Sequence, residues 1–277
     1  MEDSSGLLAD PPNLKARFDR DGCLLIRGLV DSDAVLALHE AIVSVLRQHG
    51  SHPDSATWHE ASARRWAYTA GVQRLEEFHA LAHSPPLVNV TRTLVGADAF
   101  VRPLRAFRAV WPHVAGLTTP PHHDFQYNRG TQRAVTAWVP LNSCPPRAGG
   151  LRLLLGSHRA GPFRVKSYDA LVPFGVDVAG DDPGWATATY EPGDVVIFDA
   201  LAIHASLPNE SEALRLSVDY RYQPASEPIA RPSMHPLGHV GGEVPDWAEL
   251  LDGVGWDTAR WVSPPAGLRV VEFRAPS

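Results

Sequence analysis

The sequence is poor in lysine and cysteine. Of its 25 basic residues only Lys15 and Lys166 are lysines, and the formal net charge is -6. A nucleic-acid surface needs clustered basic charge, so we expect no nucleic-acid partner. The two cysteines, Cys23 and Cys144, are too few for a disulfide scaffold or a cysteine-based zinc site. We expect both to be small buried thiols.

Long apolar runs are also missing. No stretch of eighteen apolar residues occurs, which excludes a membrane-spanning helix of ordinary length. The start of the chain is acidic and lacks the basic and apolar regions of a signal peptide. We therefore expect a cytoplasmic protein with no membrane partner. Its oligomeric state is left open.

The first third of the sequence shows helical patterns around one short apolar run. Asp31 precedes a helical pattern whose apolar residues share one face. Pro86 and Gly96 frame another helix, one near its start and one just past its end. The elements expected here are helices over 13–21, 33–48, 72–82 and 85–95, and a buried strand over 23–30.

From about residue 99 the pattern changes to short β-like runs. These runs are separated by turns rich in proline, glycine and asparagine, and no helical crossovers lie between them. This pattern predicts a mainly β protein with a helical N-terminal third and a double-stranded β-helix core, the cupin-like jelly roll. The runs cover 99–111, 133–141, 151–156, 194–200 and 214–223.

We expect a single domain over 1–277. Residues 1–98 would form a mostly helical support, 99–225 the jelly-roll core and 226–277 a C-terminal extension. Within the core, residues 159–190 form an unusually long connection. Loops of this length inside a compact domain are often lids or binding loops, and an ordinary surface excursion is the alternative.

Three residues have the pattern of a metal site. On an extended strand His122 and Asp124 point to the same side, while His123 between them points away. A third ligand has to come from elsewhere, and His204 follows directly after an apolar strand. Two histidines and one carboxylate on one face of a metal ion leave the remaining positions open. That arrangement is typical of non-haem Fe(II) oxygenases.

Arg215 adds a second element to this site. Arg215 and Ser217 alternate with apolar residues and would face the interior of the barrel. A charge facing the interior is costly unless it is paired. A guanidinium binds carboxylate through a planar pair of hydrogen bonds, so a dicarboxylate partner would explain this arginine. A surface arginine on a solvated sheet face is the alternative.

The sequence resembles the phytanoyl-CoA dioxygenase (PhyH) family of Fe(II)- and 2-oxoglutarate-dependent oxygenases. The resemblance covers most of the chain and rests on several motifs taken together. Asp124 is intact, whereas related iron halogenases carry a small residue at this position, so halogenation is not expected. The motifs are Phe18–Gly22 with Leu25–Gly28, His122–Asp124, Gly149–His158, Pro192–Asp194 with Phe198, His204–Ser206, Pro208–Ser211 and Arg215–Ser217.

The resemblance implies a role for each matching residue. His122, Asp124 and His204 would bind Fe(II), and Arg215 would hold the far carboxylate of 2-oxoglutarate. Ser206 and Ser217 match positions that often add hydrogen bonds to this co-substrate. Thr119 and Arg105 are further candidates for the same pocket. Dioxygen would be the second co-substrate.

Aromatic residues are the candidates for contact with the primary substrate. Some directly follow the metal pair, and others lie on the core strands or in the long connection. For each of them a turn or core role competes with a binding role. These candidates are Phe125, Tyr127, Trp138, Phe174 and Trp185.

The expected activity is oxidation, by default hydroxylation, of an unactivated C–H bond in a small-molecule metabolite, with succinate and CO2 as co-products. The excess of arginine over lysine is typical of a GC-rich coding sequence, which favours bacterial secondary metabolism. Acyl-CoA hydroxylation, desaturation, epimerisation and oxidative cyclisation are alternatives. So are a cupin-type metalloenzyme that is not an oxygenase and a non-catalytic binding protein.

Overall fold

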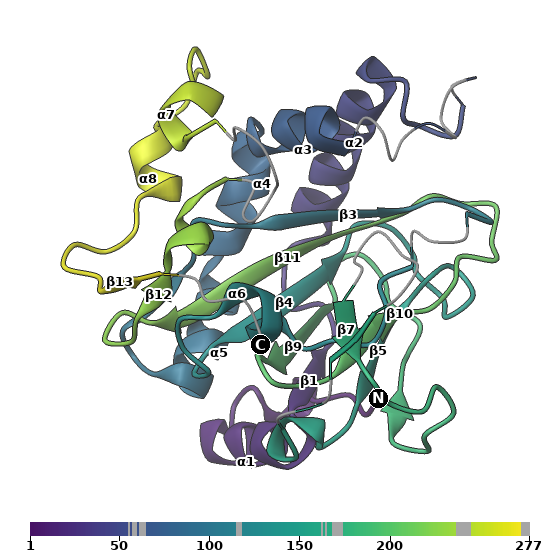
Figure 1. Ribbon diagram of the computed structural model, residues 1–277, viewed down its shortest axis with the longest axis vertical. Coiled ribbons are helices and arrows are strands. Elements are labelled where there is room, and N and C mark those ends of the chain that lie inside the picture. The colour runs from purple at the N-terminus through teal and green to yellow at the C-terminus, as the bar shows by residue number, and fades with distance from the viewer. Residues whose placement is uncertain are drawn as a thin grey trace.

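The computed structural model describes residues 1–54, 56, 60, 65–114, 118–161, 163, 165–167, 174–236 and 245–272. Two antiparallel sheets form its centre (Figure 1). The large sheet has the order β1-β9-β4-β11-β2, and β3 also pairs with β11. Its strands are β1 (Cys23–Ile26), β2 (Ala99–Val101), β3 (Ala106–Val110), β4 (Val135–Pro140), β9 (Val195–Asp199) and β11 (Arg215–Pro224).

The small sheet faces the large one across a second core. Its order is β10-β5-β8, with both pairs antiparallel, and its strands are β5 (Leu151–Leu154), β8 (Trp185–Ala186) and β10 (His204–Ser206). Two further pairs are separate from it: the antiparallel β6 (Val165–Ser167) and β7 (Phe174–Val176), and the parallel β12 (Ile229–Ala230) and β13 (Val270–Val271).

Alternation along the strands of the large sheet separates two cores. In β4, Ala137 and Val139 belong to the core beneath the helices, whereas Trp138 belongs to the core shared with the small sheet. The same division places Ile197 of β9 in the first core and Phe198 in the second. This is the expected period of two for a sheet buried on both faces.

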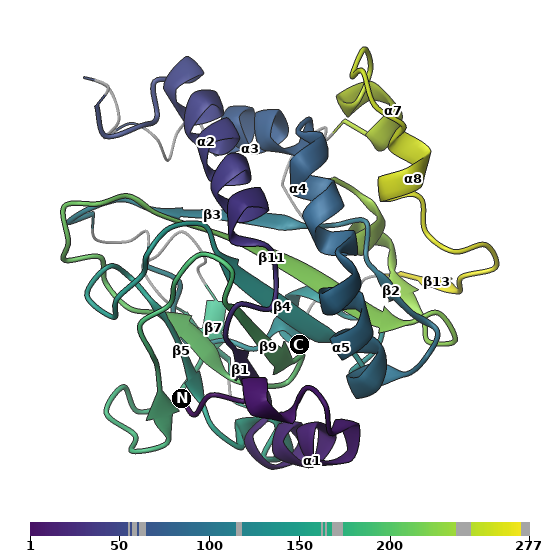
Figure 2. The same cartoon turned by 180° about the vertical axis from the view of Figure 1, so that it is seen from behind.

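The helices of the first third cover the outer face of the large sheet. Figure 2 shows α2, α4 and α5 lying across it, and their apolar side chains share the first core with the strands. The side chain of Asp31 caps the N-terminus of α2, and Gly22 ends α1 in a left-handed conformation with φ 77°. The helices are α1 (Pro11–Asp21), α2 (Ser32–Gln48), α3 (Arg65–Gln73), α4 (Glu76–Ala80) and α5 (Pro85–Val95).

This part of the chain also supplies an edge strand. β1 pairs with β9 of the large sheet, so residues 1–98 contribute to the core as well as supporting it. The helix expected over 72–82 is interrupted instead, with α3 ending at Gln73 and α4 beginning at Glu76. A short 3-10 turn, Leu81–His83, follows α4.

The C-terminal extension packs against α4. It contains the 3-10 turn Arg231–Met234, α7 (Trp247–Leu250) and α8 (Thr258–Val262). Arg74, which precedes α4, donates hydrogen bonds to the carbonyl oxygens of Leu250 at 2.5 Å and Asp252 at 2.9 Å. Among the described residues, no helix is long and apolar enough to cross a bilayer.

The connection 159–190 is more structured than a plain loop. It contains β6, β7 and β8. Residues 162, 164 and 168–173 lie outside the described residues, so its predicted role as a lid stays a prediction.

Candidate metal centre and co-substrate pocket

His122, Asp124 and His204 come together as the sequence predicts. One ligand atom from each lies within 4.8 Å of the other two, and all three residues are buried. Among the described residues no other histidine, cysteine and carboxylate group of three or more is close enough to hold a metal ion. The chemistry of this donor set, two imidazoles and one carboxylate, fits a non-haem iron.

An isolated β-bridge brings the two histidines together. His122 and His204 form an antiparallel bridge in which each backbone N–H donates to the other carbonyl, at 3.0 Å and 2.9 Å. Their rings then lie side by side with centroids 4.1 Å apart. Residues 82 positions apart in the sequence are therefore placed next to each other by backbone hydrogen bonds.

Hydrogen bonds fix which ring nitrogen of each histidine is free. Nδ1 of His122 donates to the carbonyl of Pro120 at 2.9 Å, and Nδ1 of His204 donates to that of Ala202 at 3.0 Å. Nε2 is then the unprotonated atom that can bind a metal in both rings. Burial lowers the pKa of both imidazoles, which favours this neutral form.

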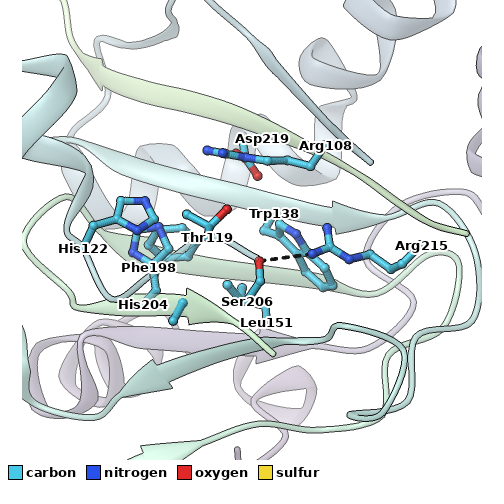
Figure 3. Close-up of a pocket in the computed structure, with 11 residues that line it drawn as sticks. Arg108, Thr119, His122, Trp138, Leu151, Phe198, His204, Ser206, Arg215 and Asp219 are labelled. Atoms are coloured by element: carbon cyan, nitrogen blue, oxygen red, sulfur yellow. Dashed lines mark hydrogen bonds and ion pairs between the residues drawn. The ribbon is translucent and has the colours of Figure 1, made fainter. Parts of the chain in front are cut away.

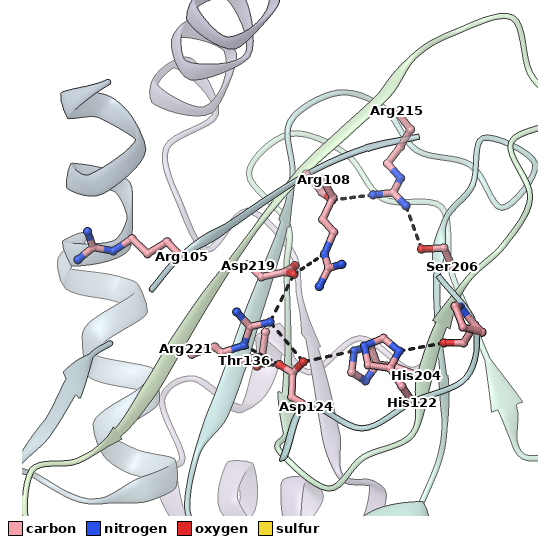
Figure 4. A network of polar contacts seen from close by, with 12 residues as sticks. Arg105, Arg108, His122, Asp124, Thr136, His204, Ser206, Arg215, Asp219 and Arg221 are labelled. Atoms are coloured by element: carbon pink, nitrogen blue, oxygen red, sulfur yellow. Dashed lines mark hydrogen bonds and ion pairs between the residues drawn. The ribbon is translucent and has the colours of Figure 1, made fainter. Parts of the chain in front are cut away.

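The two oxygens of Asp124 have different surroundings. Oδ2 accepts hydrogen bonds from the Thr136 hydroxyl and from Nε of Arg221, the latter at 2.9 Å. Oδ1 lies 3.9 Å from Nε2 of His204, which makes it the oxygen that faces the two histidines (Figure 4). Burial alone raises the pKa of this carboxyl, but Arg221, His204 and His122 together outweigh burial and hold that pKa well below its usual range. Asp124 is therefore an anion.

The backbone changes direction at Asp124. The sequence analysis places His122 and Asp124 on one extended strand, but a helical turn, α6 (Asp124–Asn128), begins at Asp124. His123 has an extended backbone and faces away from the pair as predicted, and its ring accepts a hydrogen bond from the N–H of Gln126 at 3.2 Å. The N–H of Phe125 donates to Ala200 at 2.8 Å, which ties α6 to the end of β9.

A cavity extends from the two histidines to Arg215. Figure 3 shows His122 and His204 at one end, Arg215 with Ser206 at the other, and Trp138 between them. Thr119 also lines this cavity. An arginine and a metal site at opposite ends of one buried cavity match what a molecule with two carboxylates requires.

Arg215 is buried and is oriented by three acceptors. It donates to the hydroxyls of Ser217 at 2.7 Å and Ser206 at 3.2 Å, and to the carbonyl oxygen of Gly149 at 3.0 Å. Among the described residues no carboxylate lies within ion-pair distance of its guanidinium. Its charge is thus available to a ligand, and the two serines hold it in position.

The prediction for Arg105 is wrong. Its guanidinium points to the helical side of the large sheet, where it donates to Nδ1 of His79 and, at 2.5 Å, to the carbonyl of Trp261 (Figure 4). Arg108, three residues further along the chain and within β3, lines the cavity instead. Its Nε donates to Asp219 at 2.8 Å.

The residues predicted to contact the substrate lie in different places in the structure. Tyr127 is half-buried and packs edge-on against the His122 ring, with centroids 5.5 Å apart, so it lies beside the metal site. Trp138 lines the cavity between the histidines and Arg215, which places it next to the co-substrate. Phe125 lines a separate small cavity beside Asp124.

The other two substrate candidates belong to the long connection. Trp185 pairs with Leu154 on the small sheet, and Arg152 stacks on its ring at 4.3 Å. Leu154 and Trp185 are cross-strand partners, so their side chains lie on the same face of the small sheet. The buried Leu153, next to Leu154 in β5, lies on the opposite face. Trp185 therefore points away from the cavity, contrary to the prediction. The side chain of Phe174 lies outside the described residues.

Sequence reasoning missed the residues that hold Asp124. Thr136 lies two positions before Trp138 in β4, and Arg221 lies six positions after Arg215 in β11. The signal was present, because the alternation that places Arg215 and Ser217 inside continues through Asp219 to Arg221. Following this alternation to the end of β11 identifies Asp219 and Arg221 as charged residues on the inner face.

The chain is similar in sequence to known hydroxylases and dioxygenases. The chain is 29% identical over 242 residues to 1-deoxypentalenic acid 11-beta-hydroxylase from Streptomyces exfoliatus, covering 81% of this chain and 85% of the relative. Ectoine dioxygenase from Bordetella parapertussis is 25% identical over 227 residues, covering 73% and 71%.

A solved structure shares the fold. The epimerase SnoN, in complex with Fe3+, alpha ketoglutarate and nogalamycin RO, superposes with a TM-score of 0.61 at 23% identity, covering 94% of this chain and 97% of that one. The family model described as "Phytanoyl-CoA dioxygenase (PhyH)" matches residues 18–217, which is more than half of the sequence. The chain therefore belongs to the phytanoyl-CoA dioxygenase family, the family of Fe(II)- and 2-oxoglutarate-dependent oxygenases that its motifs resemble.

Proposed function

We propose that this protein is a cytoplasmic Fe(II)- and 2-oxoglutarate-dependent dioxygenase that hydroxylates an unactivated C–H bond of a small-molecule metabolite in bacterial secondary metabolism. One observation carries the proposal. A single cavity has His122 and His204 at one end, with Asp124 beside them completing the triad, and the guanidinium of Arg215, which has no carboxylate partner among the described residues, at the other.

Each residue of the cavity has a defined task in this proposal. His122 and His204 hold the iron through Nε2, and Asp124 holds it through Oδ1. Arg215 binds the far carboxylate of 2-oxoglutarate, with Ser206 and Ser217 orienting the guanidinium. When bound, iron with 2-oxoglutarate and O2 supplies the oxidant for the C–H bond, and succinate and CO2 leave.

The walls of the cavity position the co-substrate and exclude water. Trp138 and Phe198 are almost fully buried and form an apolar surface between the two polar ends. A water-poor cavity strengthens the attraction between Arg215 and a carboxylate. Thr119 adds a hydroxyl at the same cavity, and Tyr127 lies where a primary substrate would approach the iron.

The names of the relatives support a small-molecule substrate. One acts on 1-deoxypentalenic acid and another on ectoine, neither of which is a polymer. Acyl-CoA is a weaker candidate because its several phosphates favour clustered basic residues, and the sequence has no lysine-rich run, only scattered arginines. Product analysis with candidate metabolites separates hydroxylation from desaturation, epimerisation and cyclisation.

Two functions of other classes are weaker. A cupin-type enzyme could hold zinc or manganese on the same three ligands, but it would have no need for Arg215 in the same cavity. A non-catalytic binding protein would need neither the oriented histidines nor the anionic Asp124.

An anaerobic titration tests the proposal. Addition of Fe(II) and then 2-oxoglutarate should produce a visible metal-to-ligand charge-transfer band, and exposure to O2 should release succinate. His204→Ala should lose both signals because one iron ligand is gone. His113→Ala is the matched control, since His113 is exposed and pairs only with Glu212. A wild-type protein that binds Fe(II) and gives no band with 2-oxoglutarate would contradict the proposal.

A further inference from the structure

Arg108 lies on the inner face of the large sheet, close to the metal triad. Its cross-strand partner in β11 is Ser217, and cross-strand partners lie on the same face of a sheet. Ser217 accepts a hydrogen bond from Arg215, so Arg108 shares the inner face with both residues. Figures 3 and 4 show the Arg108 side chain extending from β3 towards His122 and His204. A second arginine therefore enters the cavity, at the end where the metal would bind.

The guanidinium of Arg108 uses only one of its three nitrogens. Nε donates to Oδ2 of Asp219 at 2.8 Å. Neither Nη1 nor Nη2 has a hydrogen-bond or ion-pair partner among the described residues. These two groups form the planar pair of donors that fits a carboxylate. Asp219 thus fixes the direction of the side chain and leaves the donor pair for a ligand.

Arg108 is also the most accessible of the charged residues that line this cavity in the described part of the chain. Its side chain is 23% exposed, whereas that of Asp219 is 6% exposed. Arg215 is buried. A ligand reaches Arg215 only through the cavity, but it can reach Arg108 from the solvent side. This position suits a molecule that binds after the co-substrate.

The charges of the occupied site leave one positive charge unmatched. Fe(II) and 2-oxoglutarate balance each other, since they carry two positive and two negative charges. Three arginines then face two carboxylates: Arg108, Arg215 and Arg221 against Asp124 and Asp219. Asp219 lies 2.8 Å from Arg108 and 3.8 Å from Arg221, so it is shared between them. An unbalanced cation in a partly buried site favours the binding of one more anion.

We propose that the primary substrate is an organic acid whose carboxylate binds to Nη1 and Nη2 of Arg108. This inference rests on the proposed function and names the substrate class of that same site. Arg108 is not needed for 2-oxoglutarate, because Arg215 holds its far carboxylate and the other end binds iron. One unmatched charge and one planar donor pair fit a monocarboxylate better than a phosphate ester. Arg108 thus selects acids over neutral molecules of the same shape.

Anaerobic protein loaded with Fe(II) and 2-oxoglutarate provides the test in solution. A molecule that binds next to the iron shifts the charge-transfer band. The probes are benzoate, phenylacetate and cyclohexanecarboxylate, each compared with its neutral primary amide. An acid should shift the band at an about tenfold lower concentration than its amide, because the amide loses a charge-assisted hydrogen bond. Equal responses to acids and amides, or no response to any of these acids, would overturn the proposal.

Substitution of Arg108 separates this role from co-substrate binding. Arg108→Gln should remove the preference for acids, and Arg108→Lys should keep part of it, because lysine retains the charge without the planar donor pair. The Kd for 2-oxoglutarate should stay close to the wild-type value in both variants. Arg47→Gln is the control, since Arg47 is exposed and pairs with Asp54. If Arg108→Gln weakens 2-oxoglutarate binding as strongly as Arg215→Met, Arg108 belongs to the co-substrate and the proposal is wrong.

Crystals of wild-type protein with Ni(II) and 2-oxoglutarate test the position of the anion. After soaking in para-bromobenzoate, the carboxylate should lie within hydrogen-bond distance of Nη1 and Nη2 of Arg108, and the anomalous signal of bromine should fix the direction of the ring. A carboxylate bound elsewhere in the cavity, or none at all, would contradict the proposal. A wild-type protein without the Fe(II) charge-transfer band would refute the proposed function and this inference with it. A normal band without a preference for acids refutes this inference alone.

Discussion

Along β11, every second side chain from Arg215 to Gln223 is polar and buried. Burying such a row of polar side chains costs free energy unless each has a hydrogen-bond or ion-pair partner. Two kinds of partner occur along this row. Arg221 and Asp219 share contacts with Asp124 and Arg108, whereas Arg215 is surrounded only by neutral acceptors. At the scale of single residues, this difference separates Arg221, which holds Asp124, from Arg215, to which we assign the proposed 2-oxoglutarate carboxylate.

Replacing Arg215 should weaken 2-oxoglutarate binding strongly. Truncation of one partner of a buried charge pair costs ~2–5 kcal/mol, so Arg215→Met should raise the Kd for 2-oxoglutarate roughly 30-fold or more. Titration of the anaerobic Fe(II) protein measures this Kd. Arg105→Gln is the matched control, because this second buried arginine contacts His79 and Trp261 and not the cavity. Equal losses in both variants would contradict the assignment.

Replacing Arg221 should weaken iron binding instead. Groups that hold a metal ligand by hydrogen bonds commonly account for 10–100-fold in metal affinity. We expect Arg221→Met to raise the Kd for Fe(II) by about that factor, since Asp124 loses the bonds that orient it. Isothermal titration with Fe(II) under argon measures it. An unchanged Fe(II) affinity would show that Thr136 alone is sufficient to orient Asp124.

The metal ligands and Arg215 could be predicted because short-range rules decide them. Spacing by two places His122 and Asp124 together, and alternation places Arg215 inside. Arg105 could not be placed in this way. Arg102, Arg105 and Arg108 are spaced by three, and the chain leaves its strand between β2 and β3. That break shifts the alternation, so the sequence alone does not determine which arginine enters the cavity.

At the scale of elements, α6 follows shortly after the ligand candidate His122 and lines the small cavity beside Asp124. It begins at the ligand Asp124, is capped by His123 and ends beside Arg129 and Gly130. A turn of five residues is too short for a helical period, so its sequence cannot predict it. The long, regular elements α2, α5, β4 and β11 were predicted to within a few residues, because burial of one face determines their pattern.

Gly130 should be sensitive to substitution. Its φ is +82°, and an added Cβ would lie 2.8 Å from the backbone N of Ala230 and from the carbonyl oxygen of Pro228. Gly130→Ala should therefore lower the free energy of unfolding by at least ~1 kcal/mol. Gly180→Ala is the control, because nothing lies within 4 Å of the added atom. Urea denaturation compares them, and similar midpoints would refute the close approach.

At the scale of the whole molecule, the C-terminal extension is fastened to the helical layer by buried polar groups. Arg105 donates to His79 and to the carbonyl of Trp261, and the indole of Trp261 donates to Glu76 at 2.9 Å. The two contacts made by Trp261 join residues 156 and 185 positions apart. Apolar periodicity in either segment contains no information about such pairs, which is why they could not be predicted.

Low pH should destabilise the contacts between the C-terminal extension and the helical layer. Burial, and then the Arg105 cation, lowers the pKa of His79 to about 3 and that of His83 to about 4. In the unfolded chain both titrate near ~6.5. Between these values the unfolded state binds more protons, so stability is complete above about pH 6.5 and falls as the pH drops toward 4.

The measurement is Tm against pH for metal-free protein. We expect His79→Gln to have a shallower decline below pH 6.5 than the wild type, because one proton fewer is taken up on unfolding. His113→Ala should follow the wild-type curve, since its imidazole is exposed. Parallel curves for His79→Gln and the wild type would contradict the shifted pKa.

The bridge between His122 and His204 has a practical consequence. Because main-chain hydrogen bonds join the two histidines, the metal site should keep its shape during metal exchange. Redox-inert ions such as Co(II) or Ni(II) could then be introduced by dialysis, without refolding. Crystals prepared in this way would be stable in air, and screening them against metabolite libraries would reveal the substrate by its electron density.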